Sequence, residues 1–361
     1  MKKITRVALI TSGGDCQGLN AAMRGIGKAL HNKVENLEIF GMYDGYRGLV
    51  DGDYKFMEPK DFAGILTQGG TILGTSRQRY IPGKDIVDEN GNSLIPAMKD
   101  TYNRLNLDCL VIMGGNGTQK SAKLLMDAGM NVVTLPKTID NDIWGTDTTF
   151  GFQSAVDVAT NVIDYIHSTA SSHSRVFVVE LMGRDAGWLT LHAGIGSGAD
   201  IILIPAIPYD INAILKAVDH RRRHGRSFSI LAVAEGAKSI HDQILTEEES
   251  RRRREQSKHS TISYEIAAQI EAELGQEARV TVPGHYQRGG PPCPYDRVLA
   301  TQFGTAAADL IVNKQYGRMV AIQNGHIVSI PLEEAASKTK FLPTDHPLIQ
   351  VARDIGISFG D

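Results

Sequence analysis

The sequence has few cysteines, no long apolar run and almost no net charge. Its three cysteines, Cys16, Cys109 and Cys293, are odd in number and far apart in the chain. They provide neither a disulfide framework nor a Cys-X-X-Cys metal site, which fits a reducing compartment. No apolar run reaches the roughly 18 residues that a transmembrane helix needs. The 38 Lys and Arg nearly balance the 41 Asp and Glu, so a formal net charge of -3 gives no indication of nucleic-acid or membrane binding.

The overall composition is typical of a soluble globular protein. Apolar residues make up 42% and charged residues 22% of the 361 residues, a length sufficient for two or three domains. The first residues, MKKITRVALITSGG, have an apolar part too short for a signal peptide. We therefore expect a cytoplasmic protein.

Strand-like and helix-like segments alternate along the chain. Short apolar or β-branched runs predict strands at residues 6–11, 107–115, 131–136, 175–183, 200–205 and 228–236. Apolar positions three and four residues apart predict helices at residues 18–32, 118–129 and 151–173. Nearly continuous apolar strands separated by helices favour an α/β fold, with parallel sheets covered on both faces. In such sheets ligands bind beyond the carboxyl ends of the strands.

Two segments, Asp219–Arg226 and Glu247–Ser260, are dense in charge. The simpler interpretation is a solvated helix face or surface loop, and an anion-binding site is the alternative.

Two glycine turns follow predicted strands. Gly13 and Gly14 separate the first strand from a helix, and Gly114–Thr118 (GGNGT) has the same construction. Without Cβ atoms, such turns let backbone N–H groups approach a phosphate at the positive end of a helix. Neither turn has the Gly-X-Gly-X-X-Gly or Walker A spacing. Together they predict an extended phosphate ligand, and tight turns without a ligand are the structural alternative.

The segment Pro136–Asp142 (PKTIDND) places Asp140 and Asp142 in a predicted loop after a strand. One carboxylate could take a proton from a hydroxyl group while the other holds a metal ion or orients the first. Phosphoryl transfer needs this combination beside bound phosphates. Capping acids in an Asx turn are the alternative.

Several basic residues suit a phosphate monoester. His285 and Arg288 lie close together in GHYQRGG, and Arg175, Arg184 and Arg279 lie beside predicted strand ends or starts. Arginine binds phosphate through bidentate contacts. Any one of these residues alone would more often be structural or solvated.

The order of the motifs resembles that of the phosphofructokinases. The matching segments are TSGGD…GLNAAMRG, GGTILGTSR, GGNGT, PKTIDNDIWGTDTTFGF, SSHSRVFVVELMGR, AEGA and PGHYQRGGPPCPYDR. The similarity runs from residue 4 to about residue 325, nearly the whole chain. It implies two Rossmann-like three-layer domains with mainly parallel sheets and the active site in the cleft between them. The domain that binds the phosphoryl donor would comprise residues 1–150 and about 288–337, and the fructose-6-phosphate domain would comprise about 151–287 and 338–361.

The resemblance also implies an Mg²⁺-dependent 6-phosphofructokinase of glycolysis, which transfers the γ-phosphoryl group of ATP to the 1-hydroxyl group of fructose 6-phosphate. Asp140 matches the family's general base, and Thr138 and Asp142 would assist it. Arg184 matches the arginine near the transferred group, where developing charge needs compensation.

The resemblance assigns further residues to the two substrates. The sugar would contact Thr138, Asp140, Arg184, Met182, Gly183 and Glu235. Its 6-phosphate would contact His285 and Arg288 of one subunit and Arg175 and Arg279 of a neighbour, which implies a homo-oligomer, either dimer or tetramer. The donor would contact Gly14, Arg77, Gln78, Gly115, Asn116, Gly117 and Thr118.

Two positions depart from the family pattern. Asn116 stands where many members have an aspartate associated with Mg²⁺, so the metal would depend more on Asp140, Asp142 and the donor's own phosphates. Gly117 is typical of members that use ATP, whereas Lys137 is typical of members that use pyrophosphate. Because an aspartate at position 117 would repel the α-phosphate of ATP, Gly117 favours ATP, and pyrophosphate is the alternative.

Two other functions are weaker alternatives. NAD kinases and diacylglycerol kinases share a GGDGT-like turn, but they lack the LMGR and GHxQRGG segments found here. A catalytically silent sugar-phosphate sensor would not need Thr138, Asp140 and Arg184 together.

The bacterial ATP enzymes have a second nucleotide site at a subunit interface, at positions matching Arg24, Lys28, Asp200 and Arg226. Arginine is usual in place of Lys28 and glutamate in place of Asp200, so contacts with phosphate and metal would be looser. We expect an interface anion site with weak or absent control by ADP or phosphoenolpyruvate. Ordinary surface charges are the alternative.

Overall fold

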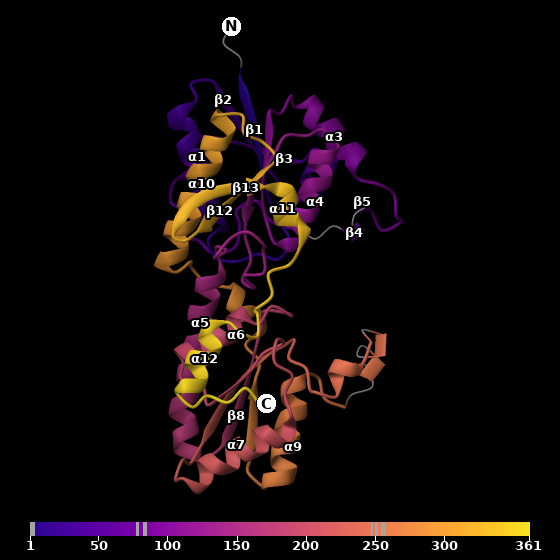
Figure 1. The fold of residues 1–361 in the computed structure, drawn as a ribbon. Coiled ribbons are helices and arrows are strands. Elements are labelled where there is room, and N and C mark those ends of the chain that lie inside the picture. Colours follow the sequence, from indigo (N-terminus) through magenta and orange to yellow (C-terminus); the bar gives the residue numbers. More distant parts are fainter. Residues whose placement is uncertain (1–3, 77–78, 82–84, 247, 250–251, 254–257) are drawn as a thin grey trace. The chain divides into compact units, whose positions relative to one another are not determined.

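The computed structural model describes residues 4–76, 79–81, 85–246, 248–249, 252–253 and 258–361 (Figure 1). The chain forms two compact units, and each unit is built from two separate stretches. Unit 1 comprises Met1–Ser154 and Arg288–Lys340, and unit 2 comprises Ala155–Gln287 and Phe341–Asp361.

Unit 1 contains a seven-stranded sheet in the order β13-β12-β7-β6-β1-β2-β3. Its strands are β1 (Thr5–Ser12), β2 (Leu37–Met42), β3 (Tyr54–Met57), β6 (Cys109–Gly114), β7 (Val132–Pro136), β12 (Arg318–Gln323) and β13 (His326–Pro331). The strands from β12 to β2 are parallel, and β3 and β13 form antiparallel edges. A separate antiparallel pair joins β4 (Arg79–Ile81) and β5 (Asp85–Val87).

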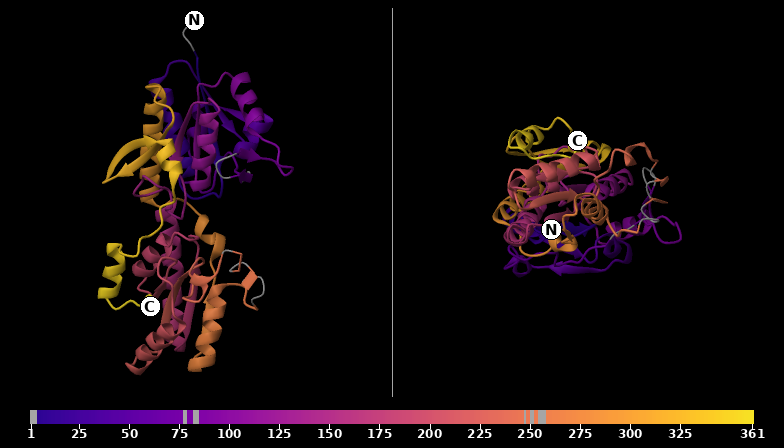
Figure 2. Two further views of the ribbon diagram at one scale, coloured as in Figure 1. Left: turned by 45° about the vertical axis from the view of Figure 1, so that its right-hand side comes forward. Right: turned by 90° about the horizontal axis from the view of Figure 1, so that it is seen from below.

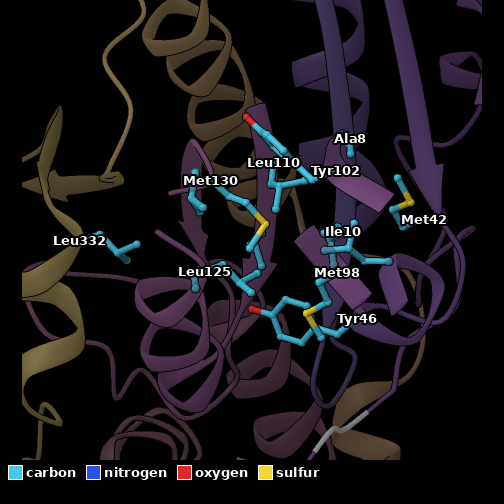
Figure 3. Close-up of a cluster of buried hydrophobic side chains, with 14 of the residues drawn as sticks. Ala8, Ile10, Met42, Tyr46, Met98, Tyr102, Leu110, Leu125, Met130 and Leu332 are labelled. Carbon is cyan, nitrogen blue, oxygen red and sulfur yellow. The ribbon is translucent and has the colours of Figure 1, made fainter. Parts of the chain in front are cut away.

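Helices cover both faces of this sheet (Figure 1). On one face lie α1 (Leu19–Lys33) and α10 (Pro294–Val312), with the short helix η1 (Pro59–Phe62) against α1. On the other face lie α2 (Tyr46–Asp51), α3 (Ile95–Arg104), α4 (Asn116–Asp127) and α11 (Leu332–Ser337). Figure 3 shows the core on this second face, where Ile10 and Leu110 of the sheet lie with Met98 of α3 and Leu125 of α4. Because both faces are covered, the central strands are apolar throughout.

Two glycines allow α1 and α10 to approach closely. A Cβ atom at Gly304 would lie 2.5 Å from the Ala22 oxygen, and one at Gly25 would lie 2.8 Å from the Thr301 oxygen. Both distances are shorter than real Cβ contacts, so the two backbones pack directly against each other here.

Unit 2 contains a four-stranded parallel sheet in the order β11-β8-β10-β9. Its strands are β8 (Val176–Leu181), β9 (Ile201–Leu203), β10 (Ser229–Ala234) and β11 (Ala278–Thr281). One face packs against α7 (Ile211–Arg223) and α9 (Ile262–Leu274), and the other against α6 (Trp188–Gly196). The remaining elements are α5 (Phe152–His173), α12 (Pro347–Asp354), and the short helices η2 (Asp242–Ile244) and η3 (Gly284–Arg288). Helix α12 packs on α6, so α12 (yellow) and α9 (orange) lie on opposite sides of the strands (Figure 2).

The predicted α/β class with mainly parallel sheets is confirmed, and every predicted strand and helix overlaps an observed one. The antiparallel edges and the β4–β5 pair were not expected. Among the described residues, no helix has the length and apolarity needed to cross a membrane.

The two charge-dense segments lie at the surface where the structure describes them. At the exposed end of α7, Arg222 and Arg223 both pair with Asp219. In the second segment Arg252 pairs with Glu248, and both side chains are exposed. These contacts agree with the solvated interpretation for the described part, while residues 247, 250–251 and 254–257 lie outside the described residues.

Candidate functional site

Three loops of unit 1 begin at the same level of the sheet. In the strand register, Ser12 of β1 pairs with Gly114 of β6, and Gly114 pairs with Pro136 of β7. The following residues, 13–14, 115–118 and 137–142, therefore lie side by side at the carboxyl edge. The structure thus brings together the two glycine turns and the acidic loop.

The second glycine turn leads directly into α4. Gly115 has no side chain to cap this helix, so the first N–H groups of α4 are available to a ligand. A Cβ atom at Gly114 would lie 2.3 Å from the Thr118 Cβ atom, so this close turn requires glycine. Gly117 is exposed, and a Cβ atom there would meet no atom of the described residues within 4 Å. The turn therefore leaves open space beside Gly117.

Asp140 is buried in the acidic loop. Its backbone N–H donates to Thr138 Oγ1 at 3.0 Å, and the Thr138 carbonyl oxygen accepts from Thr149 Oγ1 at 2.7 Å. Among the described residues, Asp140 Oδ1 has no hydrogen-bond partner. A buried carboxylate oxygen without a hydrogen bond destabilises the folded protein. A role of Asp140 in binding or catalysis would explain why such an oxygen is present here.

Lys137 connects the acidic loop to the first glycine turn. Its side chain is buried, and Nζ donates to the Gly14 carbonyl oxygen. Burial lowers the pKa of Lys137; nearby Arg288 adds to this effect, while Cys16 and Asp140 oppose it. The Lys137 side chain therefore contacts the first glycine turn from inside the protein and does not project into solvent.

The GHYQRGG segment also reaches the first glycine turn. Arg288 Nη1 donates to the Asp15 carbonyl oxygen at 2.9 Å, and Gln17 Nε2 donates to the Gly289 carbonyl oxygen at 2.7 Å. Residues 288–289 therefore border the loop that follows β1.

The sequence did not single out Asn141 and Lys340, which the structure places beside Asp140 and Asp142. Lys340 Nζ donates to Asn141 Oδ1 at 3.1 Å, and the Lys340 N–H donates to the Asp142 carbonyl oxygen at 2.8 Å. Burial lowers the pKa of Lys340 to about 8, and Asp147 and Asp142 oppose this shift. Because Lys340 is 199 residues from Asn141 in the chain, no local sequence pattern indicates this contact.

Unit 2 has a second group of loops at the carboxyl edge of its own sheet. Leu181 of β8 pairs with Ala234 of β10, so Met182–Arg184 and Glu235 follow neighbouring strands. Glu235 Oε1 accepts a hydrogen bond from the Arg184 N–H at 2.9 Å. The Met182 N–H donates to Gln287 Oε1 of η3 at 3.3 Å, and η3 also contains the exposed His285. Met182, Gly183, Arg184 and Glu235 are therefore neighbours.

Arg175 and Arg279 lie at the opposite edge of this sheet. Arg175 precedes β8, and Arg279 is in register with Phe177 near its start. Both arginines pair with Glu277. Strand β8 separates them from Met182 by about 20 Å, at roughly 3.3 Å per residue. Within one chain, they are therefore not part of the group around Met182 and Glu235.

Asn116, which stands at the position predicted to lie near Mg²⁺, has a side-chain amide oxygen that could bind the ion. Asn116 Nδ2 donates to Thr339 Oγ1, while Asn116 Oδ1 is buried without a hydrogen-bond partner in the described part of the chain. Among the described residues, no group of three or more His, Cys, Asp or Glu side chains is arranged to hold a metal ion. Mg²⁺ is usually held by one or two carboxylates together with substrate phosphates, so oxygens at Asn116 and Asp140 fit such an ion.

Two further sets of predicted residues have different outcomes. Arg77 and Gln78 lie outside the described residues. Asp200 Oδ1 pairs with Arg221 at 2.7 Å, and its Oδ2 accepts from the Ile230 N–H at 2.9 Å. Burial raises the pKa of Asp200, although the Ile230 hydrogen bond and Arg221 oppose this shift. Both oxygens of the Asp200 carboxylate therefore already have partners in the same chain.

The fold and these loops define an α/β protein of the phosphate-binding type, with glycine turns and an acidic loop at one edge of a parallel sheet. The family pattern described as phosphofructokinase matches residues 6–311. The chain belongs to the phosphofructokinase family.

Individual relatives extend the match to nearly the whole chain. An ATP-dependent 6-phosphofructokinase of Spirochaeta thermophila is 55% identical over 357 residues, covering 98% of this chain and 97% of the relative. An enzyme of the same name from Propionibacterium freudenreichii is 46% identical over 373 residues, covering 99% of each chain. The solved structure of phosphofructokinase from Saccharomyces cerevisiae superposes with a TM-score of 0.78 at 32% identity, covering 92% of this chain and 45% of that longer chain.

Proposed function

We propose that this protein is an ATP-dependent 6-phosphofructokinase of glycolysis. It transfers the γ-phosphoryl group of ATP to the 1-hydroxyl group of fructose 6-phosphate. The observation that carries this proposal is identity of 46% to 55%, over nearly full length, to relatives that bear this name. The aligned loops at the carboxyl edge of the unit 1 sheet support it independently.

Asp140 acts as the general base in this proposal. Its Oδ1, which has no hydrogen-bond partner among the described residues, accepts the proton of the sugar's 1-hydroxyl group as the hydroxyl oxygen attacks phosphorus. Thr138 orients Asp140 through the hydrogen bond from the Asp140 N–H to Thr138 Oγ1. Asp142 assists from the same loop.

The glycine turns hold the donor. The uncapped N–H groups at the start of α4 and the loop after β1 bind phosphate oxygens, through Gly14, Gly115, Asn116, Gly117 and Thr118. The open space beside Gly117 accommodates an α-phosphate, which pyrophosphate lacks. Arg77 and Gln78 complete the donor site. Their assignment comes from the family resemblance.

Mg²⁺ is the proposed metal. When bound, it neutralises charge on the donor phosphates and on the transferred group. Asn116 Oδ1 and the carboxylates of Asp140 and Asp142 are the protein oxygens that would hold it.

The residues that follow β8 and β10, together with η3, hold the sugar phosphate. Glu235 accepts hydrogen bonds from sugar hydroxyl groups beside Met182 and Gly183, and Arg184 compensates charge on the transferred group. His285 and Arg288 bind the 6-phosphate.

Arg175 and Arg279 serve the active site of a neighbouring subunit, which makes the protein a homo-oligomer. The supporting observation is their position at the edge of the sheet opposite Met182 and Glu235.

Turnover of fructose 6-phosphate with ATP, and separately with pyrophosphate, tests the proposal. We expect Mg²⁺-dependent formation of fructose 1,6-bisphosphate with ATP. Turnover with pyrophosphate alone would identify a pyrophosphate-dependent enzyme, for which Lys137 is the favouring residue. Phosphorylation of a different alcohol, or no turnover with either donor, would contradict the assignment.

A further inference from the structure

The segment Lys338–Lys340 lies along the acidic loop of unit 1. Thr339 forms an antiparallel bridge with Ile143, and the Lys340 N–H donates to the Asp142 carbonyl oxygen at 2.8 Å. Lys338 Nζ lies 3.4 Å from the centre of the Trp144 ring. Three consecutive residues therefore contact the loop that carries Asp140.

The ammonium group of Lys340 binds three oxygens of this loop. Nζ donates to Asn141 Oδ1 at 3.1 Å, to the Thr146 carbonyl oxygen at 2.8 Å and to the Asp147 carbonyl oxygen at 2.9 Å. An ammonium group has three N–H donors, so this set uses all of them. Lys340 thereby joins the two ends of the loop from residue 141 to residue 147.

The backbone at Asn141 needs such support. Its φ of 52° lies in the left-handed region, which asparagine tolerates better than most residues but which still depends on surrounding contacts to fix it. Asn141 Oδ1 also accepts from the Thr149 N–H at 3.1 Å, and its Nδ2 donates to the Asp147 carbonyl oxygen at 3.3 Å. Because Asn141 lies between Asp140 and Asp142, its conformation determines where both carboxylates point.

The segment Lys338–Lys340 also contacts the second glycine turn. Asn116 Nδ2 donates to Thr339 Oγ1, while Asn116 Oδ1 has no hydrogen-bond partner in the part of the chain that the structure describes. Thr339 therefore fixes the orientation of a residue at the start of α4.

We propose that Lys340 is a positioning residue for the general base Asp140, and that Thr339 positions Asn116 for the donor. Lys340 holds Asn141 in its left-handed conformation, and this conformation aims the neighbouring carboxylates. The inference rests on the proposed function for its kinetic consequence, but its structural part concerns the loop alone.

Lys340→Met tests the proposal, because methionine keeps the unbranched chain and removes the three donors. We expect kcat to fall by about tenfold to hundredfold, as when a catalytic group is misplaced by about 1 Å. The KM for fructose 6-phosphate should stay within about threefold, since unit 2 residues hold the sugar. Lys123→Met is the matched control: Lys123 forms an exposed pair with Asp127 on α4, and its replacement should leave both constants unchanged.

A double variant separates positioning from general damage. If Lys340 acts through Asp140, Lys340→Met should cost little more in a chain that already has Asp140→Ala. Losses that multiply in the double variant would show that Lys340 does not act through Asp140 and would overturn the proposal. Unchanged kcat in the single variant would overturn it as well.

Two further measurements keep the proposal testable if Lys340→Met folds poorly or if the wild-type protein phosphorylates another substrate. Lys340→Arg keeps the charge but not the geometry of three donors, so amide exchange at residues 141–149 should be faster than in the wild type. Exchange at wild-type rates there would contradict the structural role, whatever the reaction. Thr339→Val should raise the KM for ATP more than it lowers kcat, and the reverse result would argue against the role given to Thr339.

Discussion

Asp140 is buried, its backbone is held by Thr138, and one of its carboxylate oxygens accepts no hydrogen bond within the described residues. This arrangement suits a general base, because the position of the carboxylate is fixed and an oxygen without a partner in the described part of the chain can accept a proton from substrate. Asp140→Ala should therefore lower kcat by at least about a hundredfold, the low end for loss of a general base. Binding of fructose 6-phosphate, measured by calorimetry, should change little, and near-normal kcat would refute the role.

In the proposed function, donor choice depends on Gly117. An aspartate at this exposed position finds space in the free protein, so Gly117→Asp should fold normally. It should nevertheless raise the KM for ATP strongly, because a carboxylate would then lie against the α-phosphate. Gln302→Glu is a control for the added charge, since Gln302 is exposed in the middle of α10, away from the glycine turns. Equal effects of the two substitutions on the KM for ATP would contradict the steric argument.

At the scale of elements, strands and loops differ in how well the sequence predicts them. The strands β1, β6, β7, β8 and β10 are apolar because both sheet faces are covered, and this local property is visible in the sequence. The glycine turns and the acidic loop were predicted for the same reason: each follows its strand directly. The antiparallel strands β3 and β13 lack an uninterrupted buried run, and their assignment depends on pairing with residues elsewhere in the chain.

Lys340 shows which part of the site could not be predicted from the sequence. Its sequence neighbours give no sign that its ammonium group binds the 141–147 loop, because the contact exists only after β12, β13 and α11 are in place. Arg175 and Arg279 show a related limit. The local sequence indicated only that each suits a phosphate, and the strand register places both away from Met182 within one chain.

Helix α12 should be sensitive to acid. His346 caps it, since His346 Nδ1 accepts the Leu348 N–H at 3.3 Å, and its ring lies edge-on to Trp188 with centroids 5.0 Å apart. Burial lowers the pKa of His346 below its ordinary 6.5, although Asp345 opposes the shift. The docked helix therefore favours the neutral ring, so stability is fully present above pH 6.5 and is lost as the pH falls below that value.

Amide exchange across residues 347–354 measures this effect locally. Exchange, corrected for its intrinsic pH dependence, should show less protection at about pH 5.5 than at about pH 7.5. His346→Asn keeps a capping side chain without a titrating ring, so the difference should disappear in that variant. A difference of the same size in His346→Asn would assign the effect to another group, such as His31, whose pKa burial also lowers.

At the scale of the whole molecule, the proposed sharing of active sites between subunits predicts complementation. Asp140→Ala and Arg279→Ala should each abolish most activity as pure oligomers. After dissociation and mixed reassembly, hybrids contain sites with Asp140 from one chain and Arg279 from the other, so activity should exceed that of either variant. Failure of the mixture to regain activity, with hybrid formation shown by mass spectrometry, would place Arg279 outside the neighbour's site.

Regulation through the interface anion site should be weak. Asp200 already pairs with Arg221, and Lys28 lacks the fork of an arginine, so neither suits tight binding of a nucleotide with its metal. We expect hyperbolic kinetics in fructose 6-phosphate that respond little to ADP or phosphoenolpyruvate. Sigmoidal kinetics shifted strongly by either effector, and abolished by Arg226→Ala, would show that the site is functional.

The division of the chain has a consequence during synthesis. Unit 1 is interrupted after Ser154 and resumes at Arg288, so α10 leaves the ribosome long after α1. Until then, the face of the sheet and of α1 that α10 covers remains exposed to water, and the direct helix contact at Gly25 and Gly304 has not formed. Unit 2 is complete only when Phe341–Asp361 has been translated. Neither unit can therefore finish folding before almost all of the other unit has been translated. The nascent chain therefore passes through a long stage with exposed apolar surface, at which chaperone binding and aggregation compete with folding.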